Sequence, residues 1–336
     1  MNNWYSISGE GSDVCLASKI RLSRNISSLP FPVRMSDEVR KTVCKKVFAC
    51  VQNSKLAGEF DLMELDKLNN IQKISLVEKG IISSQMAAQE SYGAVLVSKD
   101  KSISVMLCEE DHICITVMSG CDNIDEAFRK ANELDDIFVK NMHIAFDSRL
   151  GFLTSNPMKL GTGMTAAYML HLPGICEKQM LSTLRNMVSK LGFSIRSVFE
   201  KGCFYEISND ISLGITEQSA IENLRAIYQQ IAKQEKVCRQ DLIDYGNYED
   251  KIFRAMGTLK MARQLSAEEF FSLVSLVRLG IAMNIFDNNE GVSFEKIGEM
   301  LYSLGTASII ADTKDDSFTA DEANKLRAGY IRKILE

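Results

Sequence analysis

The spacing of hydrophobic and polar residues changes along the chain, and this change predicts the order of strands and helices. Within residues 91–118, two β-rich runs, YGAVLVS and SISVMLCEEDHICITVM, flank the turn-like residues 99–101, a pattern typical of an antiparallel hairpin. Within residues 123–141, apolar residues recur every three or four positions among charged ones, which predicts an amphipathic helix. The same spacing returns at residues 216–236, where Thr216 is suited to cap the start of a helix.

Helix signals dominate the last quarter of the chain. The pairs Ser266/Glu269 and Thr319/Glu322 have the spacing of capping boxes, and each precedes an amphipathic run. All four prolines lie in the first 180 residues, so the later part of the chain is free of the main helix breaker. The sequence therefore predicts a helical second domain over residues 248–336.

Length and composition are those of a two-domain globular protein. The 336 residues accommodate a larger unit, residues 1–247, beside the helical one, and 46% hydrophobic residues suffice for a sizeable core. A net charge of -5 argues against a protein that coats nucleic acid, since such proteins carry a basic excess. The N-terminus lacks the features of a secretory signal, and the longest apolar stretch, residues 270–286, contains Arg278. We expect a soluble, cytoplasmic protein without direct nucleic-acid or membrane binding.

Cysteine and histidine spacing does not predict a metal site. The nine cysteines form neither CxxC pairs nor a zinc-ribbon pattern, and the three histidines are scattered. We therefore expect reduced thiols and no bound metal ligated by these residues.

Two short motifs leave alternatives open when each is considered alone. The acidic cluster Glu109, Glu110, Asp111, with His112, interrupts two apolar runs, which fits either a strand end that opens into a cleft or a charged hairpin edge. Residues 160–163, LGTG, follow a β-like run, so their backbone N–H groups either cradle phosphate oxygens or form a simple turn.

Taken in order, the motifs of the first domain closely resemble those of the phosphagen kinase family. The resemblance extends over about 200 residues and rests on SKIRLSRN (18–25), PFP (30–32), LVEKGIIS (76–83), CEEDHICI (108–115), LGFLTSNPMKLGTG (150–163), HLPG (171–174) and ISNDISLGITE (207–217). The last domain resembles that of bacterial protein arginine kinases in EDKIFRAMGTLKMARQLSAEE (249–269), VRLGI (277–281) and LRAGYIR (326–332).

The resemblance implies an α+β fold, with an antiparallel sheet flanked by helices, and an ATP:guanidino phosphotransferase that uses ATP with Mg²⁺. Glu110 takes the position of the carboxylate that orients the guanidinium and receives its proton. The implied nucleotide-binding positions are Ser18, Lys19, Arg21, Cys114, Thr165, Ala166, Ala167, Met169, Arg196 and Ser197.

Several of these positions depart from the family pattern, which uses arginines to clamp the phosphates. Lys19 stands for an arginine and cannot bind a phosphate bidentately, and Cys114 and Thr165 stand where the family has arginines. The loop after Arg196 is shortened, and Glu200 is the only candidate there for a second substrate carboxylate.

The resemblance also implies partners. Related proteins phosphorylate arginine side chains of protein clients, mark proteins for Clp proteolysis and inactivate a transcriptional repressor, and their helical domain supports a homodimer. Arg327 lies in the region that receives phosphoarginine in active relatives, but the leading Arg-Asp pair of that motif is absent. Two hypotheses follow from the sequence: an active protein arginine kinase, or a catalytically impaired adaptor that regulates a kinase, a client or a Clp component.

Overall fold

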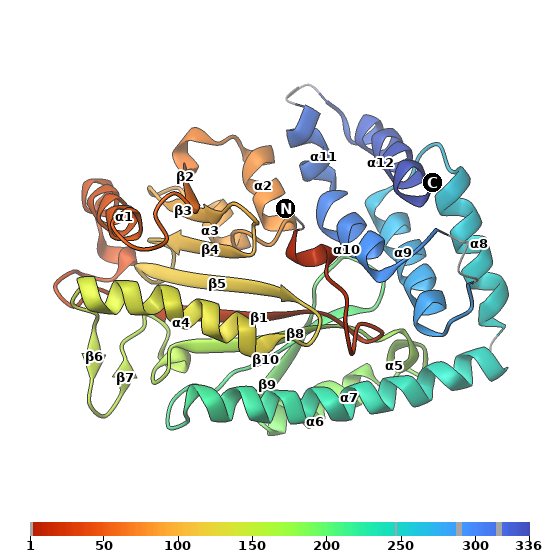
Figure 1. The fold of residues 1–336 in the computed structure, drawn as a ribbon, viewed down its shortest axis with the longest axis horizontal. Coiled ribbons are helices and arrows are strands. Elements are labelled where there is room, and N and C mark those ends of the chain that lie inside the picture. Colours follow the sequence, from red (N-terminus) through yellow and green to blue (C-terminus); the bar gives the residue numbers. More distant parts are fainter. Residues whose placement is uncertain (1–2, 246, 287–290, 314–317) are drawn as a thin grey trace.

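The computed structural model describes residues 3–245, 247–286, 291–313 and 318–336 (Figure 1). A large antiparallel sheet fills the first part of the chain, and β1 lies inside it, paired with β5 on one side and β8 on the other. Its strands, in spatial order, are β2 Phe60–Glu64, β3 Ala94–Ser98, β4 Ile103–Leu107, β5 Ile113–Gly120, β1 Cys15–Arg24, β8 Met164–His171, β10 Phe204–Asn209 and β9 Phe193–Ser197. A separate hairpin consists of β6 Phe146–Asp147 and β7 Gly151–Phe152.

The helices fall into two groups, one packed on the sheet and one that forms the C-terminal part. The first group is α1 Asp37–Gln52, α2 Asn70–Glu78, α3 Ser84–Ala88, α4 Ile124–Asn141, α5 Pro173–Glu177, α6 Leu181–Lys190 and α7 Glu217–Tyr245. The second is α8 Tyr248–Met261, α9 Ala267–Ala282, α10 Phe294–Ser303, α11 Thr306–Thr313 and α12 Ala320–Leu335. Short 3-10 turns occur at η1 Trp4–Ser6, η2 Pro32–Arg34, η3 Leu65–Lys67 and η4 Pro157–Lys159.

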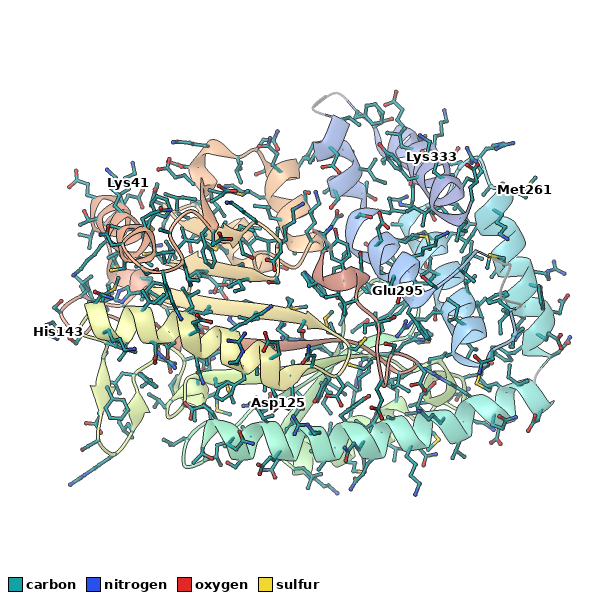
Figure 2. The ribbon with its side chains drawn as sticks, viewed as in Figure 1. Lys41, Asp125, His143, Met261, Glu295 and Lys333 are labelled. Atoms are coloured by element: carbon teal, nitrogen blue, oxygen red, sulfur yellow. The ribbon has the colours of Figure 1, made fainter. Side chains whose placement is uncertain are left out.

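One face of the sheet is covered by α1, α4 and α7, and it holds the main hydrophobic core (Figure 1). From β1, Ile20 and Leu22 are fully buried in this core. The apolar stripe of α4 packs on them because its buried residues recur at helical spacing. An ion pair of 2.5 Å between Arg225 of α7 and Asp125, which is labelled on α4 in Figure 2, joins the two helices at the surface.

The other face of the sheet is partly covered by the C-terminal helices. Ala17, Met118 and Met169 of the sheet share a second core with residues of α8 to α12. Glu78, at the end of α2, accepts hydrogen bonds from the backbone N–H groups of Ala307 (3.1 Å) and Ser308 (2.7 Å) at the start of α11. The helical part is therefore fixed against the sheet domain by polar as well as apolar contacts.

The N-terminal segment lies between the two parts. Trp4 packs edge-on against Tyr302 of α10, with ring centroids 4.6 Å apart. Ser8 donates a hydrogen bond to Glu295, which is labelled at the start of the same helix in Figure 2. The guanidinium of Arg278 in α9 donates to the carbonyl of Ser12 at 2.5 Å. The residues before β1 thus connect the sheet to α9 and α10.

The α+β fold expected from the sequence is confirmed, with two local corrections. The run expected as the second strand of a hairpin forms two strands, β4 and β5, because residues 108–112 turn the chain and Cys108 adopts a φ of 59°. The helix expected at residues 216–236 extends to Tyr245, and Thr216 caps it by accepting from the N–H of Ser219 at 3.1 Å. No helix in the described part of the chain is both long and apolar enough to cross a bilayer.

The buried ion pair of α7 generates a stability prediction. Glu235 accepts from the N–H groups of Gly174 (2.8 Å) and Ile175 (2.9 Å) and from Arg239 Nε (2.6 Å), and both charged side chains are almost fully buried. Glu235→Gln leaves the Arg239 cation without its partner, so we expect a loss of about 3 kcal/mol in urea unfolding. Glu222→Gln, an exposed change on the same helix, should cost less than about 0.5 kcal/mol. Equal effects of the two changes would contradict this assignment.

Candidate active site

The pleat of the sheet brings most of the sequence-predicted site residues to one face. Side chains of a strand alternate between faces, and directly paired residues of antiparallel strands share a face. Lys19 and Arg21 of β1 therefore lie beside Ala167 and Thr165 of β8 and beside Met118 and Thr116 of β5. Met169, Cys114, Glu206 and Arg196 follow on the same side of their strands. We call this surface the open face.

Three residues expected at the nucleotide site lie on the other side of the sheet. Ser18 and Ala166 alternate with the open-face residues and are fully buried on the side of α4 and α7. Ser197 pairs with Tyr205, which packs against that same core, and its hydroxyl donates to the carbonyl of Phe199 at 2.9 Å. The pleat therefore directs these three side chains away from the open face, which corrects their assignment as side-chain ligands.

Glu206 gathers the two cations at the β8–β10–β9 end of the open face. Lys19 Nζ lies 2.5 Å from one carboxylate oxygen, and Arg196 donates to the other through Nε at 3.0 Å and through Nη2. Glu206 is 4% exposed. Burial raises the pKa of this carboxyl group, but Lys19 and Arg196 outweigh burial and lower the pKa to about 2. Glu206 is therefore an anion that is bound by both cations, and it compensates one of their two positive charges.

Arg21 is paired in the same way. Its Nη2 lies 2.5 Å from Glu109 Oε2, its Nε donates to Cys114 Sγ at 2.6 Å, and Ser83 donates to the other oxygen of Glu109. Cys114 is buried beneath this pair, and burial raises the pKa of its thiol. Arg21 thus faces a neutral thiol and a carboxylate.

Glu110 remains the accessible carboxylate of the acidic cluster. Its side chain is 25% exposed, and its partner is Lys159 of η4, whose Nζ lies 2.6 Å from Oε2. Asp111 is buried and accepts from Asn25 Nδ2 at 2.6 Å and from the N–H of Ser155 at 2.7 Å. His112 is buried between the N–H of Ile26 and the carbonyl of Pro30. The cluster therefore divides into three buried residues, Glu109, Asp111 and His112, and one partly exposed carboxylate, Glu110.

The glycine-containing residues 160–163 lead into β8 and not into a helix. The Thr162 N–H donates to the carbonyl of Ser212 at 3.2 Å, and the carbonyl of Gly161 accepts from Phe152. These contacts favour the simple turn over a phosphate cradle, because the Thr162 N–H is already bound to a carbonyl and no helix N-terminus follows to attract an anion.

A cavity of about 370 Å³ opens between the open face and the C-terminal helices. Lys19, Met118, Met169 and Glu206 of the sheet contribute to its walls. The rest of the lining comes from α2, from the loop after β9 and from the helical part, including Glu78, Gly80, Phe199, Glu200, Phe271, Tyr302 and Thr306. Polar and aromatic groups thus surround a space large enough for a small organic ligand.

Arg327 is a packing residue in this structure. It is fully buried, and its guanidinium donates to the carbonyls of Leu304 (2.9 Å) and Leu265 (2.7 Å), to Asn324 Oδ1 (2.6 Å) and to Thr306 Oγ1 (2.7 Å). These neutral acceptors hold α12 against the start of α9 and the α10–α11 junction. Arg327, which the resemblance aligns with a phosphoarginine receptor, is therefore buried among neutral acceptors, and a receptor role at this position stays a prediction.

The pairing of the cations disfavours a bound Mg-ATP, which would have to displace the carboxylates. A triphosphate needs cations that are free to meet several negative charges, but Lys19, Arg21 and Arg196 each already bind a carboxylate. No cluster of His, Cys, Asp and Glu suited to a metal ion occurs among the described residues.

Sequence reasoning missed Glu206 and Lys159. Glu206 could have been found as the single acid within the apolar run FYEIS (204–208). A carboxylate is rarely buried in a strand without a cation, so its presence there indicates an ion pair. Lys159 carried no such signal, since a lysine in a polar loop is usually solvated.

The depressed pKa of Glu206 predicts a pH dependence of stability. A carboxyl group whose pKa falls from 4.5 to about 2 on folding stabilises the fold above pH 4.5, and this contribution disappears as the pH falls through the folded-state value. The free-energy difference between wild type and Glu206→Gln should therefore shrink by on the order of 2 kcal/mol as the pH is lowered from 7 through this window. Urea unfolding at a series of pH values measures it, and a difference independent of pH would contradict the ion pairs.

Comparison with known proteins places the chain among guanidino phosphotransferases. Residues 40–238 match the ATP:guanido phosphotransferase C-terminal catalytic domain, and residues 246–336 match the protein-arginine kinase McsB C-terminal domain. The chain is 33% identical to the protein-arginine kinase of Clostridium tetani, over 100% of this chain and 99% of that protein. It is 36% identical to the protein-arginine kinase of a Geobacillus species, over 100% of this chain and 94% of that protein.

Solved structures share the fold. The duplicated taurocyamine kinase from Schistosoma mansoni with bound transition-state-analogue components superposes with a TM-score of 0.63 at 18% identity, over 76% of this chain and 39% of that one. Lombricine kinase gives a TM-score of 0.58 at 19% identity, over 74% of this chain and 71% of that one. Since the catalytic-domain match alone includes more than half of the residues, and full-length relatives extend it to both ends, the chain belongs to the ATP:guanido phosphotransferase family.

Proposed function

We propose that this protein is an arginine-directed member of the protein-arginine kinase branch, which binds arginine side chains of partner proteins at Glu110 and transfers phosphoryl groups from ATP much more slowly than members with a complete arginine clamp. The observation that carries the proposal is a contrast between two halves of the open face. The carboxylate half is the surface around Glu110, and the phosphate half is the surface around Lys19, Arg21 and Arg196. In the carboxylate half, Glu110 is a quarter exposed and is paired with one lysine, whereas in the phosphate half Lys19, Arg21 and Arg196 are each paired with a buried carboxylate, Glu206 or Glu109.

The carboxylate half suits a guanidinium. A guanidinium stays charged at all physiological pH values and presents a planar fork of N–H donors, so it needs a carboxylate to hold it. Glu110 is a quarter exposed, and its loop is fixed because Ser155 Oγ donates to its carbonyl at 2.6 Å. A fixed backbone with an accessible carboxylate can orient an arginine side chain from another protein.

The phosphate half is weakened at several positions. Cys114 and Thr165 offer no charge where the family pattern has arginines, and Lys19 is a single-point cation. Removal of one transition-state arginine costs roughly 10³ to 10⁵ in rate in other phosphoryl-transfer enzymes, and such losses are not additive. Slow transfer, or none, follows from this composition.

The second candidate function is a fully active protein-arginine kinase. It is favoured by the position of Lys19, Arg21 and Arg196 on the same open face as the acidic turn, and by relatives of that name that match the whole chain. In either case we propose that clients are proteins, that the helical part supports a homodimer, and that stress response, a transcriptional repressor and Clp proteolysis are the context in which the protein acts.

A phosphoarginine assay separates the two candidates. With labelled ATP, Mg²⁺ and a generic basic protein, we expect transfer at least about 10³-fold slower than that of an active relative assayed in parallel. Any residual transfer should disappear in Glu110→Gln, because the guanidinium then lacks its carboxylate. A rate equal to that of the relative would contradict the proposal and establish the active kinase.

Partial restoration of the clamp gives a second test. Thr165 lies directly opposite Arg21 on the open face and is not fully buried, so Thr165→Arg adds a cation there without filling the core. Cys114→Arg is less suitable because Cys114 is buried beneath Arg21. We expect Thr165→Arg to tighten Mg-ATP binding about tenfold, as measured by calorimetry, and to raise turnover by less, since the shortened loop leaves the guanidinium held mainly by Glu110.

The matched control is Thr42→Arg, an exposed substitution on α1 that adds the same positive charge as Thr165→Arg. An equal gain in Mg-ATP affinity in both variants would show that only overall charge matters and would contradict the assignment of Thr165 to the phosphate half.

A further inference from the structure

Two ion-paired groups of the open face, Glu110 with Lys159 and Glu206 with its two cations, have a common feature. In each, the residue that could bind a ligand is already paired with another side chain of the protein. That side chain carries a charge of the same sign as the ligand, so it occupies the ligand's place. Glu110, which would hold a guanidinium, binds the ammonium of Lys159 at 2.6 Å. Lys19 and Arg196, which would hold an anion, bind the carboxylate of Glu206.

We propose that Glu206 and Lys159 are selectivity residues that occupy the anion and cation subsites of the open face as internal substitutes for the ligands. Glu206 is a permanent occupant that weakens the binding of polyphosphates, and Lys159 is an exchangeable occupant that an arginine side chain displaces. The inference rests on the proposed function for the identity of the arginine ligand.

Glu206 is held where an anionic ligand would have to bind. It lies on the wall of the 370 Å³ cavity together with Lys19. Its backbone belongs to β10, which pairs with β8 on one side and β9 on the other. The Glu206 side chain therefore stays on the open face, next to its cross-strand partner Arg196 of β9. A phosphate that enters the cavity meets a fixed negative charge in a buried setting, where like charges repel strongly.

The exposure of the two cations strengthens this effect. The Lys19 side chain is 19% exposed, and that of Arg196 is 65% exposed. The Arg196 side chain can rotate into solvent and bind an anion outside the cavity, but Lys19 remains beside Glu206. The anion subsite therefore keeps its internal carboxylate even when Arg196 moves.

Lys159 is held less firmly. The backbone of η4 is fixed, because Asn156 caps it at the Met158 N–H and Ser212 Oγ donates to the carbonyls of Met158 and Leu160. The Lys159 side chain itself reaches Glu110 through a flexible stem and is 23% exposed. A guanidinium offers two parallel N–H donors to a carboxylate, so it displaces a single ammonium at this position.

Calorimetric titration tests both halves of the proposal. The probes are inorganic tripolyphosphate without metal, for the anion subsite, and a short synthetic peptide with one arginine, for Glu110. Glu206→Gln should tighten tripolyphosphate binding at least tenfold and leave peptide binding unchanged. Lys159→Met should tighten peptide binding about threefold to tenfold and leave tripolyphosphate binding unchanged.

Matched controls separate local contacts from net charge. Glu126→Gln and Lys140→Met remove the same charges from exposed ion pairs on α4, which packs on the opposite side of the sheet. Each control should change the affinity for either probe by less than twofold. Equal gains in Glu206→Gln and Glu126→Gln would overturn the selectivity role of Glu206, and equal gains in Lys159→Met and Lys140→Met would overturn that of Lys159.

Further outcomes distinguish this inference from the proposed function. Glu206→Ser, which removes the charge and leaves room for a phosphate oxygen, is the second variant, and it should gain at least as much as Glu206→Gln. No gain in either Glu206 variant, with peptide binding at Glu110 intact, overturns the inference alone. Loss of peptide recognition at Glu110, seen as identical peptide affinity in wild type and Glu110→Gln, overturns the proposed function as well.

Discussion

The pleat of β1 is the constraint on which the rest of the structure depends. This strand lies inside the sheet, so its side chains point alternately into the main hydrophobic core and onto the open face. Ile20 and Leu22 are buried against α4, and the residues between and before them, Arg21 and Lys19, must then lie on the open face. A shift of one residue in register would bury both cations in the main core, which fixes the open face as firmly as the core itself.

Because the cations cannot leave the open face, their charge has to be compensated there. Glu206 and Glu109 provide this compensation from β10 and from the turn after β4. The same carboxylates that stabilise the sheet lower its capacity for anionic ligands. Stability and ligand selectivity thus have one electrostatic origin in this protein, and the neutral Cys114 and Thr165 add to the effect by removing cations that would have shifted the balance.

The sequence was sufficient for the elements whose signals are local. The amphipathic spacing of α4 and the cap at Thr216 depend on neighbouring residues, and the structure contains both, whereas the turn at residues 108–112 was expected to lie within one β-rich run. The face on which a site residue lies depends on strand register, so Ser18, Ala166 and Ser197 were assigned to a surface that their side chains do not reach.

The pairing of charges depends on contacts between distant segments. Lys19 and Glu206 are 187 residues apart, and Arg327 finds its acceptors 21 to 62 residues away, except for Asn324. No local sequence pattern predicts which charged residues form an ion pair. The burial of Arg327 among carbonyl groups likewise follows only from the packing of α9 to α12.

The central claim is that each of the cations Lys19, Arg21 and Arg196 in the phosphate half of the open face is already bound to a carboxylate of the protein. Thermal unfolding of the unmodified protein with and without millimolar Mg-ATP tests it most directly, because a ligand stabilises the folded state by RT ln(1 + [L]/Kd). The account predicts a rise in the midpoint temperature of less than about 1 °C, since binding at or weaker than the ligand concentration adds less than about 0.5 kcal/mol. A rise of many degrees, which requires binding at least about a hundredfold tighter than that concentration, would contradict it.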